Sequence, residues 1–177
     1  MDRVILLACW FLLFSLPSSG EEVAPGVLRT PDLRFVNLAD FPYDANYAQF
    51  NGVRIHYLDE GPQTGKPILL LHGLPTWSYL YRKMMPALIE AGHRVIVPDL
   101  IGFGKSDKFI DKTNYSYAHH IETIKYLVNS LDLRDATFFG QDWGGMIGLR
   151  VVAEMPDRFA RVAVSNTGMV ARAGISD

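Results

Sequence analysis

One six-residue turn constrains the possible fold of this chain more than any other part of its sequence. Residues 140–145 spell GQDWGG, between a short apolar run at 136–139 and a very apolar segment at 143–155. A sharp turn from a strand into a helix holds its central residue in a strained backbone conformation, and side chains at the flanking positions would clash. The glycines therefore predict a strand–turn–helix unit in which the side chain of Asp142 points out of the sheet.

The residue at the centre of this turn also restricts the reactions that the site could catalyse. Asp142 occupies the place of serine in the G-x-S-x-G spacing of a nucleophile elbow. A carboxylate there is ionised at neutral pH, lies at the N-terminus of a helix that favours an anion, and needs no base to activate it. With an acyl substrate it would form an anhydride, whereas at an sp³ carbon it can displace a leaving group and give an alkyl ester.

Water activated by a histidine can hydrolyse such an ester, so Asp142 points to alkyl halides or epoxides as substrates and excludes a serine-type esterase. A plainer interpretation, that Asp142 only caps the helix, stays open at this point.

Around this turn, strand-like runs alternate with helical patterns. Apolar runs predict strands at 53–58, 67–72, 94–98, 136–139 and 160–165, and helical spacing predicts helices at 77–91, 116–131 and 143–155. A glycine-rich loop at 99–107 and other short loops join them. Such alternation is typical of an α/β fold with a mostly parallel sheet and helices on both faces.

A second motif, His72-Gly73-Leu74-Pro75, follows the predicted strand at 67–72. In folds with a nucleophile elbow, the turn after this strand supplies one oxyanion donor and the residue after the nucleophile supplies the other. The two donors would be the backbone N–H groups of Leu74 and Trp143, which would stabilise the tetrahedral intermediate of ester hydrolysis. The side chain of His72 itself is expected to be a hydrogen-bonded structural histidine.

The side chain of Trp143 lies next to the predicted nucleophile. Its indole N–H donates a hydrogen bond and accepts none, which suits a departing halide ion. The alternative is a packed core tryptophan whose N–H is satisfied elsewhere.

Composition excludes several other classes of function. The chain has 177 residues, a formal net charge of −2, 49% apolar residues and 20% charged residues. These values exclude an intrinsically disordered chain, and without a basic run they make nucleic acid an unexpected partner. A single cysteine, Cys9, permits neither a disulfide framework nor a cysteine zinc site, and we expect no metal and no cofactor.

The N-terminus has the pattern of a targeting segment. Arg3 precedes an apolar run at 4–16, and Pro17 with the small residues up to Gly20 follows it. This order predicts a secretory signal peptide at 1–20, a periplasmic or secreted protein, and a mature domain that begins at residue 21. Thirteen helical residues would span only about 20 Å, so no stable membrane span is expected.

Four segments together resemble the haloalkane dehalogenases of the α/β-hydrolase superfamily. They are HGLPTWSYLYRKM (72–84), PDLIGFGKSDK (98–108), FGQDWGGMIGLR (139–150) and PDRFARVAVSNTG (156–168). The resemblance implies the α/β-hydrolase fold, with Asp142 as nucleophile, Trp143 as halide-binding residue and oxyanion donor, and the backbone of Leu74 as second oxyanion donor. It implies a small haloalkane substrate, water and a released halide.

Epoxide hydrolases are similar and also carry an aspartate followed by a tryptophan, so they remain the alternative. Gln141 favours the dehalogenases, because related epoxide hydrolases usually carry histidine there.

The resemblance also implies residues that the sequence does not contain. Family members place the orienting acid and the catalytic histidine on later chain, beyond a helical cap, in the order nucleophile, acid, histidine. None of the five histidines here occupies that position, and His119 and His120 are expected to be solvated or capping residues at a helix start. Residues 21–177 are therefore expected to be an N-terminal portion of the core domain, without cap or C-terminal strands and inactive alone. A non-catalytic remnant is the other possibility.

Overall fold

The computed structural model describes residues 20–168 of the chain. The predicted signal peptide therefore lies outside the described residues, apart from Gly20. Within the described part, no helix is both long and apolar enough to cross a membrane.

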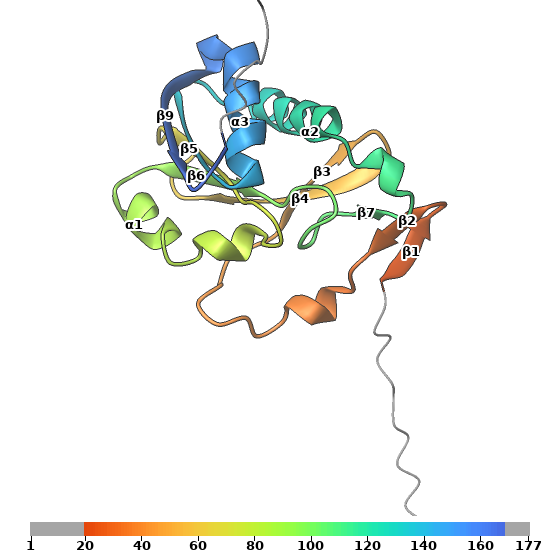
Figure 1. Ribbon diagram of the computed structural model, residues 1–177. Helices are drawn as coiled ribbons and strands as arrows, with labels where there is room; N and C mark the ends of the chain where they lie inside the picture. Colours follow the sequence, from red (N-terminus) through yellow and green to blue (C-terminus); the bar gives the residue numbers. More distant parts are fainter. Residues whose placement is uncertain (1–19, 169–177) are drawn as a thin grey trace, which may run out of the picture.

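A six-stranded mixed sheet forms the centre of the molecule (Figure 1). Its order is β3 (Asn46–Phe50), β4 (Val53–Glu60), β6 (Arg94–Pro98), β5 (Pro67–Leu71), β8 (Ala136–Gln141) and β9 (Phe159–Ser165). The four strands from β6 to β9 run parallel, whereas β3 and β4 pair antiparallel at one edge. The predicted α/β class and mostly parallel sheet are confirmed.

Helices cover both faces of this sheet, as predicted. Helices α2 (Tyr117–Ser130) and α3 (Trp143–Glu154) lie on one face, and α1 (Met85–Glu90) lies on the other (Figure 1). Strand β5 shows why, because its side chains alternate between the two sides. Leu69 and Leu71 pack in the cluster that contains the α2 and α3 side chains. Ile68 and Leu70 pack in the cluster that contains Met85 of α1.

The single helix predicted at 77–91 is wrong. The structure has a short 3₁₀ helix, η2 (Ser78–Tyr81), and then the six-residue α1. The backbone N–H of Ser78 is hydrogen-bonded to the buried carboxylate of Asp99, at 2.7 Å. This long-range bond sets the start of η2, and Pro86 lies in the first turn of α1, where proline is tolerated. The 3.6-residue pattern could not indicate that break.

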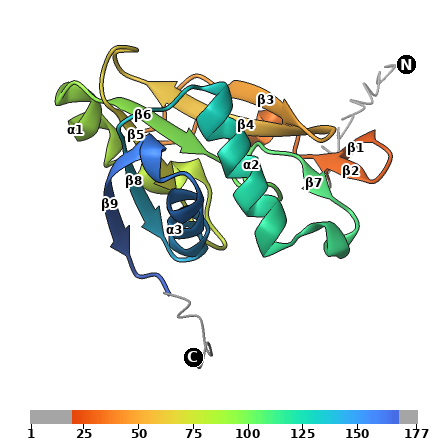
Figure 2. The same cartoon turned by 90° about the horizontal axis from the view of Figure 1, so that it is seen from above.

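A second, three-stranded sheet was not predicted. It contains β1 (Glu21–Ala24), β2 (Val27–Arg29) and β7 (Lys108–Phe109), and lies at the opposite end of the molecule from β9 (Figure 2). The guanidinium of Arg29 donates two hydrogen bonds to the carboxylate of Asp107, at 2.8 and 3.0 Å. The small sheet therefore fixes the end of the glycine-rich loop at 99–107 to the start of the domain.

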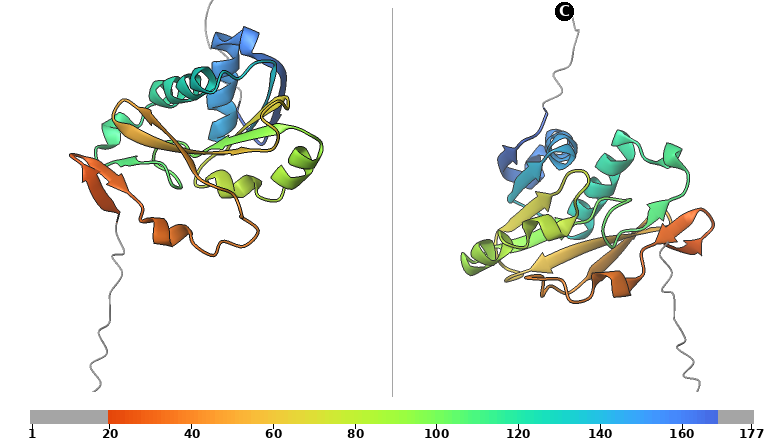
Figure 3. Two further views of the ribbon diagram at one scale, coloured as in Figure 1. Left: turned by 180° about the vertical axis from the view of Figure 1, so that it is seen from behind. Right: turned by 60° about the horizontal axis from the view of Figure 1, so that its bottom comes forward.

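The segment that joins the two sheets crosses the face that carries α1 (Figure 3). It contains η1 (Asp32–Phe35), and η3 (Lys112–Asn114) and η4 (Pro156–Arg158) are short 3₁₀ turns elsewhere in the chain. Phe35 and Phe41 pack against the ring of Trp77, with centroids 5.2 and 5.3 Å away. These contacts hold the segment against the turn that leads into η2.

Candidate active site

The backbone at Asp142 has the geometry of a nucleophile elbow. Asp142 joins β8 to α3 with φ 55° and ψ −128°, a combination that costs an L-residue about 1–3 kcal/mol. The following glycines make the joint possible. A Cβ at Gly144 would overlap the carbonyl oxygens of Leu71 and His72, and a Cβ at Gly145 would overlap the side chain of Thr167. The predicted strand–turn–helix unit is confirmed.

Residues that follow β9 hold this strained turn in place. The Thr167 hydroxyl donates to the carbonyl oxygen of Asp142 at 2.6 Å, and the Asp142 N–H donates to the carbonyl oxygen of Asn166 at 3.2 Å. Neither residue was predicted from the sequence to be part of the site. Their only signal is a run of Asn, Thr and Gly directly after a predicted strand.

The turn after β5 lies against the carboxylate of Asp142. The backbone N–H of Leu74 donates to Asp142 Oδ1 at 2.9 Å. Gly73 permits this approach, because a Cβ there would overlap the Asp142 side chain. The other carboxylate oxygen, Oδ2, accepts no hydrogen bond from the described residues. The N–H of Trp143, at the first position of α3, likewise has no acceptor among them.

His72 is a structural residue, as expected. Its ring is fully buried, with Nδ1 donating to the carbonyl oxygen of Gly73 at 2.9 Å and Nε2 accepting from the N–H of Leu100 at 3.0 Å. Burial lowers the pKa of His72, although the charge of Asp99 opposes that shift. Both ring nitrogens are engaged, so His72 is a neutral imidazole that shapes the turn before Leu74.

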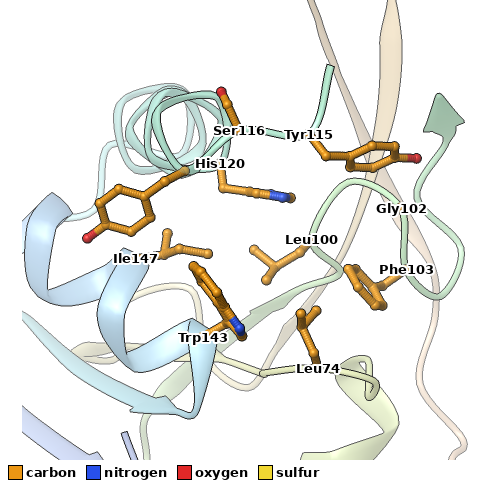
Figure 4. Close-up of a pocket in the computed structure, with 10 residues that line it drawn as sticks. Leu74, Leu100, Gly102, Phe103, Tyr115, Ser116, His120, Trp143 and Ile147 are labelled. Atoms are coloured by element: carbon orange, nitrogen blue, oxygen red, sulfur yellow. The ribbon is translucent and has the colours of Figure 1, made fainter. Parts of the chain in front are cut away.

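A mostly apolar cavity of about 380 Å³ opens beside the elbow (Figure 4). The indole of Trp143 projects into it, with its nitrogen toward the side where Leu74 lies (Figure 4). The lining comes from the elbow, the turn after β5, the loop after β6 and the start of α2: Leu74, Leu100, Gly102, Phe103, Tyr115, Ser116, Tyr117, His120, Trp143 and Ile147. Trp143 is 41% exposed, so it is not a packed core tryptophan.

The expectation for His120 was wrong. His120 is neither solvated nor a cap, because its imidazole points into the cavity (Figure 4) and its Nδ1 is buried without a hydrogen-bond partner. Burial lowers the pKa of His120 to about 4, and His119 and His72 add to the shift. The cavity therefore holds one neutral imidazole among apolar and aromatic side chains. The cap of α2 is Ser116, whose hydroxyl accepts from the N–H of His119 at 3.1 Å.

The buried carboxylate of Asp99 was not predicted from the sequence either. Asp99, at the end of β6, is fully buried, and its Oδ2 lies 2.8 Å from His56 Nδ1. Burial alone would raise the pKa of Asp99, but the hydrogen bonds and charge of its partners, His56 first, hold that pKa below its usual value. Asp99 is therefore an ionised carboxylate inside the core.

Nothing in residues 20–168 forms a group of three or more histidine, cysteine or acidic side chains that could hold a metal ion. The site of this part of the chain consists of a carboxylate, backbone N–H groups and an indole.

The family model for the alpha/beta hydrolase fold matches residues 66–175. This chain belongs to the alpha/beta hydrolase fold family. The match includes the turn at Leu74 and the elbow at Asp142, so the strained aspartate lies where members of the family carry their nucleophile.

Within the alpha/beta hydrolases, this chain is similar to haloalkane dehalogenases and, more distantly, to epoxide hydrolases. A haloalkane dehalogenase from Psychrobacter cryohalolentis is 56% identical over 146 residues, which are 80% of this chain and 48% of that protein. The structure of a haloalkane dehalogenase from Paraglaciecola agarilytica superposes with a TM-score of 0.77 at 46% identity, covering 80% of this chain and 49% of that one. An epoxide hydrolase from Mycobacterium thermoresistibile is more distant, with a TM-score of 0.63 at 30% identity, covering 69% and 38%. The chain thus spans about half the length of these dehalogenases.

Proposed function

We propose that this chain carries the nucleophilic half of a haloalkane dehalogenase. The observation that carries the proposal is the strained aspartate at the elbow, with one carboxylate oxygen bound by the Leu74 N–H and the other free of hydrogen bonds from the described residues. The identities above 50% with haloalkane dehalogenases support the choice of reaction. The substrate would be a small haloalkane, and the second reactant would be water.

The two carboxylate oxygens would have different roles. Asp142 Oδ2 would attack the carbon that bears the halogen, forming a C–O bond as the C–halogen bond breaks and the halide leaves with the electron pair. Asp142 Oδ1 would then be the carbonyl oxygen of the alkyl ester. When water attacks this ester, negative charge develops on Oδ1, where the N–H groups of Leu74 and Trp143 would stabilise it.

Trp143 would serve the leaving halide as well. Its indole N–H projects into the mostly apolar cavity beside Asp142, and few polar groups there compete for an anion. A donor held in such a cavity favours the charge that develops on the halide as the bond breaks.

The base that activates water would come from chain beyond the described residues. All five histidines lie within residues 20–168, and none is hydrogen-bonded to Asp142. The ring nitrogens of His72 are both engaged, and His56 is paired with the buried Asp99. Residues 21–177 would therefore be an N-terminal portion of the catalytic domain, able to form the ester without hydrolysing it.

Intact mass spectrometry of the chain tests the proposed reaction. We expect incubation with 1-bromobutane to add one butyl group in place of a proton and to release one bromide. The Asp142→Asn variant should form no adduct, because a neutral amide is a poor nucleophile. Asp135→Asn is the matched control, since Asp135 is an exposed aspartate that also has a positive φ, of 50°.

A parallel incubation with 1,2-epoxybutane separates the two candidate reactions. An adduct with the mass of the whole epoxide, formed faster than the butyl adduct, would replace the dehalogenase proposal with epoxide opening. The Asp142 side chain makes no capping hydrogen bond to α3, so absence of any adduct at Asp142 with either reagent would contradict its proposed role as nucleophile.

We also propose that residues 1–20 are a signal peptide and that the protein is periplasmic or secreted. The support is the sequence pattern alone: a basic residue, a thirteen-residue stretch that is apolar except for Ser15, and small residues after Pro17.

A further inference from the structure

The carboxylate of Asp99 collects hydrogen bonds from three separate segments of the chain. Its Oδ1 accepts from the backbone N–H of Ser78 at 2.7 Å. Its Oδ2 accepts from the N–H of Lys105 at 2.8 Å and lies 2.8 Å from His56 Nδ1, which must donate because a carboxylate has no proton to give. Gly104 leaves room for these contacts, since a Cβ there would overlap the carboxylate.

Asp99 and its neighbour Leu100 anchor the two ends of the turn that carries Leu74. At the far end, Asp99 holds the N–H of Ser78. At the near end, the N–H of Leu100, next to Asp99, donates to His72 Nε2, and His72 Nδ1 donates to the carbonyl oxygen of Gly73. The N–H that contacts Asp142 lies between these two anchors.

We propose that Asp99 is a positioning residue that aims the Leu74 N–H at Asp142 Oδ1. Asp99 does not touch the nucleophile, so it acts through the turn at residues 73–78. The inference rests on the proposed role of Leu74 as an oxyanion donor. A donor must be held in place before the reaction to stabilise the developing charge.

An ionised carboxylate suits this task better than a neutral side chain. Three N–H donors converge on two oxygens, and a carboxylate can accept from all of them at once. An amide at the same place would present an NH₂ group to at least one of the backbone donors. Hydrogen bonds to a charged acceptor are also stronger than neutral ones, which stiffens the turn.

The test follows the backbone amide of Leu74 by NMR in the 177-residue chain. In the unmodified chain we expect the Leu74 amide shift to follow the titration of Asp142, because the two groups are 2.9 Å apart. The Asp142→Asn variant should abolish that titration. In Asp99→Ala, the amplitude should fall by at least about half and the Leu74 amide should exchange about tenfold faster.

Asp107→Ala is the matched control. Asp107 is a second buried carboxylate on the same loop, and it accepts hydrogen bonds from the Arg29 guanidinium and the N–H of Arg54. It has no hydrogen bond to the turn at 73–78 in the described structure. This variant should lose stability as Asp99→Ala does, yet keep the Leu74 titration, so general loosening of the fold is distinguished from loss of positioning.

Ser78→Pro provides a second variant if Asp99→Ala does not fold. Proline removes the N–H that Asp99 Oδ1 binds, together with a buried hydroxyl that has no hydrogen-bond partner, and it is tolerated at the first position of a helix. The preceding residue, Trp77, already has the extended conformation that proline favours, with φ −154° and ψ −173°. We expect the Leu74 titration to weaken in this variant too.

A full Leu74 titration in folded Asp99→Ala or in Ser78→Pro would overturn the inference, as would equal loss in Asp107→Ala. These outcomes leave the proposed function standing. By contrast, a Leu74 amide shift that does not respond to Asp142 in the unmodified chain would show that the oxyanion contact is absent. The inference about Asp99 and the proposed function both depend on that contact.

Discussion

At the scale of single residues, the two oxygens of Asp142 are in different surroundings. Oδ1 is bound by the Leu74 N–H, whereas Oδ2 receives no hydrogen bond from the described residues. The sequence could predict Asp142, because glycines at this spacing between a strand and a helix have few other uses. It could not predict Thr167, which supports the elbow through a contact 25 positions away.

The indole N–H of Trp143 should matter for bond breaking. We expect Trp143→Phe to slow butyl transfer from 1-bromobutane about tenfold, because a hydrogen bond to a developing anion is lost while the aromatic bulk stays. The rate of adduct formation by mass spectrometry is the measurement. Trp77→Phe is the control, since Trp77 stacks on Tyr79 and lies outside the cavity lining. Equal rates in all three proteins would contradict the role of Trp143.

At the scale of elements, local sequence patterns predicted the strands and helices whose limits are set by residues close by in the chain. The predicted helix at 116–131 is confirmed as α2, with Ser116 as its cap. The helix predicted at 77–91 was wrong because Asp99, from another strand, binds the first N–H of η2. The hairpin of β1 and β2 turns at Pro25-Gly26, which is a local signal. Its place in a sheet with β7 was missed because residues 27–28 pair with 108–109, far along the chain. Contacts of this kind leave no local pattern.

The loop at 99–108 should show a distinct dependence on pH. Lys108 Nζ donates to the carbonyl oxygens of Gly104 and Ser106, and burial lowers the pKa of Lys108 to about 8 despite the opposing charges of Asp99 and Asp107. The usual lysine value of 10.5 applies to the unfolded chain, which therefore binds more protons between these two pH values. The free energy of unfolding should accordingly gain a favourable contribution as pH rises through this window.

Urea unfolding at several pH values from about 7.5 to about 9.5 measures this contribution. The unmodified chain should gain stability relative to Lys108→Met as the pH rises, because methionine cannot titrate. Parallel curves for the two proteins would show that Lys108 keeps an ordinary pKa.

At the scale of the whole molecule, the chain spans about half the length of its dehalogenase relatives and presents an open site. Trp143 and Leu74 are 41% and 44% exposed, and β9 exposes Val162 and Val164 at the edge of the sheet. The carboxylate of Asp142 is held at the elbow, whereas no described histidine is hydrogen-bonded to it. The fold and the elbow at Asp142 could be predicted from sequence, while the surroundings of His120 depend on how α2 packs over the cavity.

Bromide release should therefore stop after one equivalent per chain. The nucleophile is consumed as the ester forms, and no histidine is hydrogen-bonded to Asp142 to activate water. An ion-selective electrode follows the release from 1-bromobutane over time. Sustained release beyond one equivalent would mean that a base within this chain serves the reaction.

The N-terminus should be removed near Gly20 during export, because an apolar run bounded by Pro17 and small residues fits a signal peptidase. N-terminal sequencing of the protein from the periplasm of a bacterial host is the measurement. A product that still begins at Met1 and stays in the cytosol would refute both the signal peptide and the proposed location.

Peptide mapping of the chain after reaction with 1-bromobutane shows directly whether Asp142 is the nucleophile. We expect a butyl ester on Asp142 alone, lost on mild alkaline treatment and absent in Asp142→Asn. His120 is the informative alternative, since its imidazole is neutral and faces the same cavity. A butyl group on His120 that resists alkali, with Asp142 unmodified, would show that Asp142 is not the nucleophile.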